Sequence, residues 1–202
     1  MAIGVVNRRR IYLRIAVILW NGVSAASLST AMPSEPAAIG REQNLKQQLS
    51  GKRFDGSRVS LRVEKSKFLL TVVYRGRAVR SYPVVLGTDP VGNKRFEGDG
   101  RTPEGDFKIV DIRSPHKWSK FLLLSYPTAA SRRRFAAARS AGRIPVGATV
   151  GGYIGIHGVP KGHDGAIDSH QNWTAGCVSL KTHDIDEIAS VCRRGTLVRI
   201  LH

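Results

Sequence analysis

The sequence has few cysteines, few acidic residues and no long uninterrupted apolar run. Two cysteines in 202 residues exclude a small scaffold held together by disulfides. Only 15 Asp and Glu face 32 Lys and Arg, so the formal net charge is +17, and the expected partners are anionic. Hydrophobic residues at 42% and charged residues at 23% exclude wholesale disorder. The length suits one domain plus a tail.

The N-terminal segment has the parts of a secretory signal. A basic stretch at residues 8–10 precedes an apolar stretch at 11–20, and small residues follow as far as Ala31. Arg14 interrupts the apolar stretch, which is shorter than the roughly 20 residues of a membrane span. The alternative is a buried amphipathic helix. We expect residues 1–31 to be a signal peptide, with its cleavage left open, and the protein to be exported to the periplasm or cell envelope. Membrane contact is expected only through this segment.

The rest of the chain indicates a linker and one mainly β domain. Residues 32–57 contain prolines, glutamines and charges, which predicts a linker with one short helix around 44–49. From Arg58 the hydrophobic period changes to two, and Gly76 predicts a hairpin turn. Strands are predicted at 59–63, 68–74, 78–86, 107–112, 121–125, 150–156 and 195–201, with helices at 128–141 and 184–194 and a long loop at 87–105.

The two predicted helices differ in what they present. The first contains Arg132, Arg133, Arg134 and Arg139, which could bind nucleic acid or lipid but are more simply a solvated face. Since these arginines are not interleaved with the several aromatic residues of a stacking platform, no nucleic-acid partner is expected. The second helix has a capping-box-like start at Asp184 and Glu187 and one apolar face, formed by Ile185, Ile188, Ala189 and Cys192.

His157 and Cys177 are the residues best suited to catalysis. His157 ends a predicted strand, and Cys177 follows Gly176 and precedes Val178, where a nucleophile on a tight turn would lie. A thiol attacks as the thiolate, and its ordinary pKa of about 8.5 means that it needs a neighbouring base or cation. An imidazole can remove that proton and return it to a leaving amine. The backbone amides of Gly176 and Cys177 could stabilise a tetrahedral oxyanion.

Two other interpretations of these residues remain open. Cys177 and Cys192 could form a disulfide in an oxidising compartment, although Cys192 is expected on a buried helix face and the glycine turn faces outward. His157, His163, His170 and Cys177 could bind zinc. Separations of six, thirteen and twenty residues from His157 match no compact zinc spacing, however, and no His-Glu-x-x-His motif is present.

The pattern around these residues resembles the YkuD-type L,D-transpeptidase catalytic domain family. His157 is followed, after sixteen residues, by Thr174-Ala175-Gly176-Cys177, similar to the family's Ser/Thr-x-Gly-Cys. Upstream, Val85-Leu86-Gly87 and the segment 100–107 resemble the family's strand end and its Thr-Pro-x-Gly-x-Phe motif. The resemblance covers residues 58–202. The sequences of residues 97–105 and of the segment Trp173-Thr174-Ala175-Gly176-Cys177 are most similar to the YafK-like branch.

The resemblance implies a mainly β, sandwich-like or barrel-like catalytic fold with two or three covering helices. It implies Cys177 as nucleophile and His157 as proton donor and acceptor. Many members have Ser after the histidine and a second His before Gly-Cys, where this chain has Gly158 and Ala175. The group that orients the imidazole is therefore not identified, although a backbone carbonyl could serve. Expected substrate contacts are Gly158, His170, Trp173 and Thr174.

The chemistry that the resemblance implies is acyl transfer on peptidoglycan stem peptides, without a metal or organic cofactor. The thiolate would attack the carbonyl of stem residue three, and the thioester would pass to the amine of a second stem or to a lysine of a wall-linked lipoprotein. Transfer to water, an amidase or carboxypeptidase activity, is the first alternative, and a non-catalytic wall-binding module is the second. We expect a monomer.

Overall fold

The computed structural model describes residues 45–50 and 54–202. The predicted signal peptide, residues 1–31, lies outside these ranges, as does most of the predicted linker, so both stay predictions. The helix expected around residues 44–49 is confirmed as α1, Leu45–Ser50. No helix in the described part of the chain has the length and apolar content that a membrane span requires.

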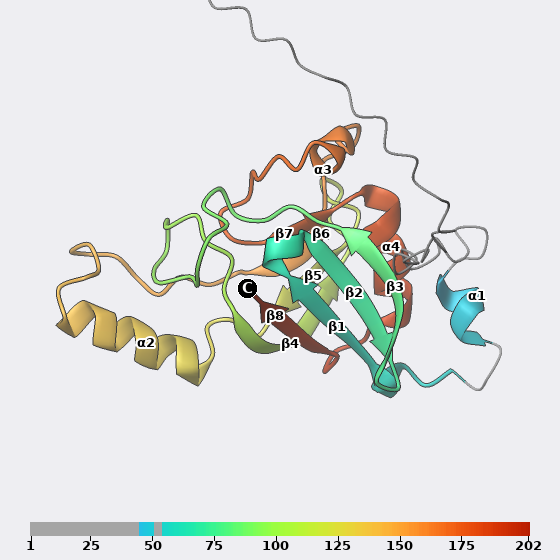
Figure 1. Ribbon diagram of the computed structural model, residues 1–202, viewed down its shortest axis with the longest axis horizontal. Helices are drawn as coiled ribbons and strands as arrows, with labels where there is room; N and C mark the ends of the chain where they lie inside the picture. Colours follow the sequence, from blue (N-terminus) through green and yellow to red (C-terminus); the bar gives the residue numbers. More distant parts are fainter. Residues whose placement is uncertain (1–44, 51–53) are drawn as a thin grey trace, which may run out of the picture. The chain divides into compact units, whose positions relative to one another are not determined.

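One sheet of eight strands organises the described residues (Figure 1). Its spatial order is β3-β2-β1-β8-β4-β5-β6-β7, with parallel pairing only for β1 with β8 and for β6 with β7. The strands are β1 Val59–Glu64, β2 Leu69–Tyr74, β3 Arg77–Pro83, β4 Gly105–Arg113, β5 Phe121–Leu124, β6 Gly155–Gly158, β7 Val178–Leu180 and β8 Leu197–Leu201.

The two ends of this sheet meet, so the strands form a nearly closed barrel. The chain continues past β3 to Val85, whose amide and carbonyl both bond with Ser179 on β7, at 2.9 and 2.8 Å. The hydrophobic core is formed by side chains at alternating positions of the strands. Val59, Leu61 and Val63 on β1 are buried while the residues between them are not, and each such side chain contributes about 1.5–3 kcal/mol relative to exposure. The predicted barrel-like, mainly β fold is confirmed.

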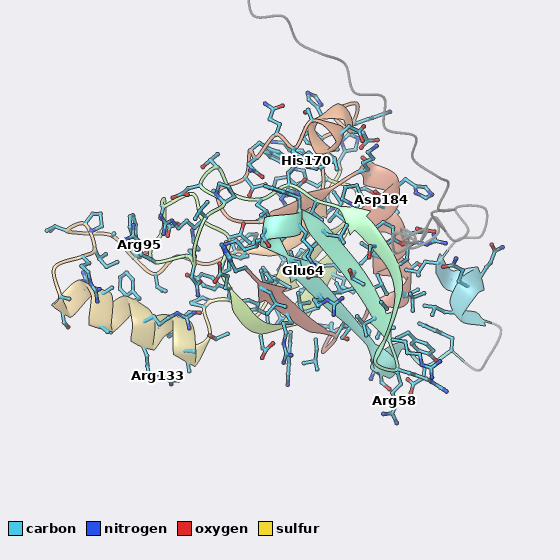
Figure 2. The ribbon with its side chains drawn as sticks, in the orientation of Figure 1. Arg58, Glu64, Arg95, Arg133, His170 and Asp184 are labelled. Carbon is cyan, nitrogen blue, oxygen red and sulfur yellow. The ribbon has the colours of Figure 1, made fainter. Side chains whose placement is uncertain are left out.

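The helices are α1, α2 Ala129–Ser140, α3 Gly165–Asp168 and α4 Thr182–Val191. Helix α4 packs on β6 and α1 packs on α4. Helix α2 begins where Thr128 accepts the amide of Ser131 at 3.2 Å, and Ser131 is its one buried residue. Its arginines are exposed, which agrees with a solvated face; Figure 2 shows Arg133 on the side facing away from the sheet.

Three local predictions were wrong or incomplete. The strand expected at 150–156 begins only at Gly155, because Gly151 and Tyr153 have φ of 73° and 61°, which an extended strand does not tolerate. No strand was predicted at β7. Helix α4 begins at Thr182 without a side-chain cap, so the predicted capping box does not form. The Glu187 carboxylate instead accepts hydrogen bonds from the Leu45 amide, Arg80 and the Tyr82 hydroxyl.

Candidate active site

The parallel pairing of β6 with β7 brings His157 and Cys177 to one face of the sheet. His157 lies opposite Ser179, and Ile156 lies opposite Val178. Extending this register by one residue sets Cys177 opposite Gly155, two positions before His157. Residues two apart on a strand share a face, so the two side chains are diagonal neighbours on that face. A parallel pair needs a long crossover connection, and the crossover that includes α3 supplies it.

The His157 ring is held in one orientation by the next peptide unit. Its Nδ1 lies 2.8 Å from the carbonyl oxygen of Gly158. A carbonyl only accepts, so Nδ1 carries the proton and, in the neutral ring, Nε2 carries the lone pair. A Cβ added at Gly158 would lie 2.8 Å from the Trp118 carbonyl oxygen. Glycine after the histidine therefore lets the chain pass close to Trp118.

Three aromatic rings enclose the imidazole. Its centroid lies 4.8 Å from that of Trp118, 5.7 Å from that of Phe121 and 5.5 Å from that of Trp173. His157 is consequently buried, with 2% of its surface exposed. Burial lowers the pKa of His157 below its ordinary value; the Gly158 carbonyl opposes that shift and the charge of Lys117 adds to it. The ring is neutral at neutral pH, which suits a general base.

The turn that carries Cys177 depends on glycine and on a buried hydroxyl. Gly176 has φ of 138°, and a Cβ there would lie 2.6 Å from the carbonyl oxygen of Arg101. Thr174 Oγ1 accepts the Gly176 amide at 3.1 Å and donates to the Cys177 carbonyl at 2.7 Å. Thr174 is buried and its hydroxyl braces the turn; as a substrate contact it stays a prediction.

The Cys177 thiol is half-buried and bonded to backbone groups. Sγ accepts the Gly155 amide at 3.4 Å and donates to the Tyr153 carbonyl at 3.8 Å. Within the described residues no hydrogen bond joins it to His157, and catalytic bonds are often loose when no substrate is bound. Burial raises the pKa of the thiol above its ordinary value, while the Gly155 amide and the charge of Lys94 oppose that rise. A thiol in this setting needs a base to become a thiolate.

An ion pair behind the turn was not anticipated from the sequence. The Lys94 ammonium lies 2.8 Å from Asp99 Oδ1, with 3% and 2% of the two side chains exposed. Lys94 also donates to the Ala175 carbonyl at 3.3 Å. Burial raises the pKa of the Asp99 carboxyl, but the Arg95 amide, Lys94 and the Arg101 amide outweigh it, and the pKa falls. The one sequence feature that could have indicated this pair is the Glu-Gly-Asp-Gly-Arg segment at residues 97–101.

The other predicted contact residues are placed differently from one another. Trp173 is half-buried against the His157 ring. Gly158 is buried and orients His157. His170 is exposed on the loop after α3, where Figure 2 shows it, and its ring packs 5.4 Å from that of Phe68 rather than among the rings around His157. These three stay predictions as substrate contacts.

The two alternative interpretations of the cysteines can be compared with the structure. Cys177 and Cys192 are both free, and Cys192 packs against the main core, where burial raises its pKa to about 12. The disulfide does not form. In the described part of the chain, no group of three or more His, Cys, Asp or Glu is arranged to hold a metal ion.

A family model for the YkuD L,D-transpeptidase catalytic domain matches residues 58–200, more than half of the sequence. The chain belongs to this family. The predicted family is therefore confirmed, while the YafK-like branch stays a prediction. Among proteins with curated descriptions, none matches this L,D-transpeptidase-type domain by sequence.

Solved structures share the fold of this YkuD domain. Bd1075 from Bdellovibrio bacteriovorus is 20% identical, with a TM-score of 0.51 over 72% of this chain and 48% of that one. The helical cell shape determining protein Pgp2 from Campylobacter jejuni is 21% identical, with a TM-score of 0.51 over 77% of this chain and 54% of that one. The chain thus spans about half the length of these proteins.

Proposed function

We propose that this YkuD-family domain is a peptidoglycan L,D-transpeptidase, with Cys177 as nucleophile and His157 as general base and acid. The observation that carries the proposal is the bond from His157 Nδ1 to the Gly158 carbonyl. It leaves Nε2 as the basic atom of a buried, neutral imidazole, on the same sheet face as Cys177. Family membership supports the reaction class.

In the first half-reaction, His157 Nε2 takes the thiol proton as Cys177 Sγ turns from the Tyr153 carbonyl towards the substrate. Sγ attacks the carbonyl carbon of stem residue three, and a tetrahedral oxyanion forms. The Gly176 amide already donates to Thr174, so of the two predicted donors the Cys177 amide is the one assigned to this oxyanion. The C–N bond then breaks, and the imidazolium returns the proton to the departing amine. A thioester remains.

In the second half-reaction, an acceptor amine gives a proton to His157 Nε2 and attacks the thioester. The C–S bond breaks, the imidazolium protonates the thiolate, and a new amide is released. The amine of a second stem peptide yields a crosslink, and the lysine of a wall-linked lipoprotein yields an attached protein. The role of Pgp2 as a cell shape determining protein agrees with a wall substrate. The predicted export to the periplasm or envelope and the formal net charge of +17 support such a substrate as well.

The pH profile should show a general base with a lowered pKa. Because burial lowers the pKa of His157 below 6.5, the ring stays neutral and competent as the pH falls from 8 towards 6.5. We expect kcat/KM for acyl transfer to stay level over this range and to decline only at lower pH. Rates measured from pH 4.5 to 9 would check this, and an acid limb centred above 6.5 would contradict it.

The function is tested by intact-mass measurement. The purified chain is incubated with disaccharide-tetrapeptide, with and without an amine acceptor, beside Cys177→Ala. With the parent protein we expect a covalent adduct whose bound stem peptide has lost its terminal amino acid. We also expect a dimeric or acceptor-linked product. Neither should form with Cys177→Ala.

Other outcomes of this experiment have definite meanings. An adduct that yields only trimmed monomer, even with excess acceptor, would overturn transfer in favour of hydrolysis. If neither an adduct nor a product forms, the enzyme assignment fails and a wall-binding module becomes the better description. Adduct formation that persists in Cys177→Ala would overturn the choice of nucleophile.

A further inference from the structure

The loop between β3 and β4 is held by two lysines whose ammonium groups are buried. Lys94, on the loop itself, pairs with Asp99. Lys65, which follows β1, pairs with Glu104 at 2.8 Å with 1% of the lysine side chain exposed. Lys65 also donates to the carbonyls of Gly92 and Thr102. Both lysines therefore hold the same loop, but only Lys94 reaches the cysteine turn.

Lys94 lies directly behind the turn that carries the nucleophile. Its Nζ lies 3.3 Å from the Ala175 carbonyl oxygen and would be 3.4 Å from a Cβ built on Gly176. Nothing wider than glycine fits there, since the Arg101 carbonyl oxygen would lie 2.6 Å from the same Cβ. The ammonium is thus held against two of the residues that immediately precede Cys177.

The Asp99 carboxylate, which pairs with Lys94, also accepts hydrogen bonds from three backbone amides. Asp99 Oδ1 accepts the Arg101 amide at 3.0 Å as well as the Lys94 ammonium. Its Oδ2 accepts the amides of Arg95 and Phe96 at 2.6 and 3.3 Å. These amides stabilise the negative charge of Asp99 by hydrogen bonding. Asp99 therefore cancels only part of the positive field of Lys94 at the cysteine turn.

Stability is a weak reason for such a pair. Taking two charges out of water costs about as much as their attraction returns, and apolar replacements of buried pairs are often neutral or stabilising. What an apolar pair could not supply is a fixed positive charge and a donor at Ala175. The charge that acts on Cys177 is that of Lys94 from the loop, and Asp99 lies behind it. The titratable group on the neighbouring strand β6 is the neutral His157 ring, which feels the charge of Lys117.

We propose that Lys94 is a positioning residue for Cys177: it fixes the cysteine turn through the Ala175 carbonyl and favours the thiolate by its charge. Asp99 holds the Lys94 ammonium in place through their ion pair. The inference rests on the proposed function only in taking Cys177 as the nucleophile. In the free protein, burial raises the pKa of the thiol and Lys94 limits that rise. During acylation the same charge stabilises the attacking and departing sulfur.

The test measures thiolate formation without any substrate. In a Cys192→Ala background, Cys177 is the single thiol, and its alkylation by iodoacetamide is followed by intact mass from pH 6 to 11. The main variant is Lys94→Gln with Asp99→Asn, which removes both charges and keeps amide donors and acceptors. The matched control is Lys65→Gln with Glu104→Gln, which removes the other buried pair of the same loop. Lys94→Arg retains the charge. Thermal melting verifies that each variant is folded.

We expect the midpoint of alkylation in Lys94→Gln/Asp99→Asn to rise by about 0.5 to 1 pH unit, which is a three- to tenfold lower rate below the midpoint. The control pair and Lys94→Arg should stay within about 0.3 unit of the parent. An unchanged midpoint in the Gln/Asn variant overturns the proposal, as does an equal rise in the control pair or in Lys94→Arg. Because no peptide substrate is involved, loss of the proposed transferase function would leave this result standing.

Discussion

Cys177→Ser is expected to lower acyl transfer by at least about 10⁴-fold, the scale of losing a nucleophile in a coupled catalytic unit. Serine is nearly isosteric, so Gly176, Thr174 and the Gly155 amide can keep their positions. What changes is the acidity of the attacking group. The buried hydroxyl has a far higher pKa than a thiol, and the neutral His157 imidazole has a lowered pKa. Proton transfer from the serine therefore becomes strongly unfavourable.

The loss is measured as product formed from disaccharide-tetrapeptide and an amine acceptor. The matched control is Cys192→Ala, which removes the other free thiol. It should leave the transfer rate within about twofold, since Cys192 packs against the main core. Equal melting temperatures of the parent and Cys177→Ser would separate chemistry from folding. Full activity in Cys177→Ser would remove Cys177 as the nucleophile, and a silent Cys192→Ala is required for the comparison to stand.

His157→Gln should lower kcat/KM by about 10²- to 10⁴-fold, the usual contribution of a positioned general base. Glutamine fills part of the space between Trp118, Phe121 and Trp173 and can still donate to the Gly158 carbonyl. It has no basic atom where Nε2 lies. The residual rate should also lose the acid limb expected below pH 6.5, because the group that titrates there has been removed.

A structural effect of this substitution would look different. If His157→Gln acted only through packing, the acid limb would persist in the remaining activity. His183→Gln serves as the matched histidine control, because that side chain is 80% exposed on α4 and should keep the parent rate and pH profile. A His157→Gln protein with more than a tenth of the parent kcat/KM would contradict the assignment of the base.

Most strands could be predicted because their signals are local. On β1 the alternation of Val59, Leu61 and Val63 is the same in sequence and structure, and the hairpin at Gly76 follows from two consecutive residues with positive φ. The start of β6 could not be predicted, because Tyr153 adopts φ of 61° although its neighbours read as a strand. Its carbonyl contacts Cys177 and its ring packs on Phe121, contacts that fix this conformation from outside the segment.

By itself the sequence determined the mainly β class and the family, and it predicted His157 and Cys177 as the catalytic pair, since alternation, glycine turns and a spaced His and Cys pattern are all properties of short stretches. Only the tertiary structure decided how these parts act together. The parallel register of β6 and β7 decides that His157 and Cys177 share a face. The carbonyl that orients the ring and the ammonium behind the turn are likewise set by the packing of the folded chain, since Lys94 and Ala175 are 81 positions apart in the sequence. Backbone carbonyls occur at every residue and buried ion pairs depend on packing, so no local pattern marks either one.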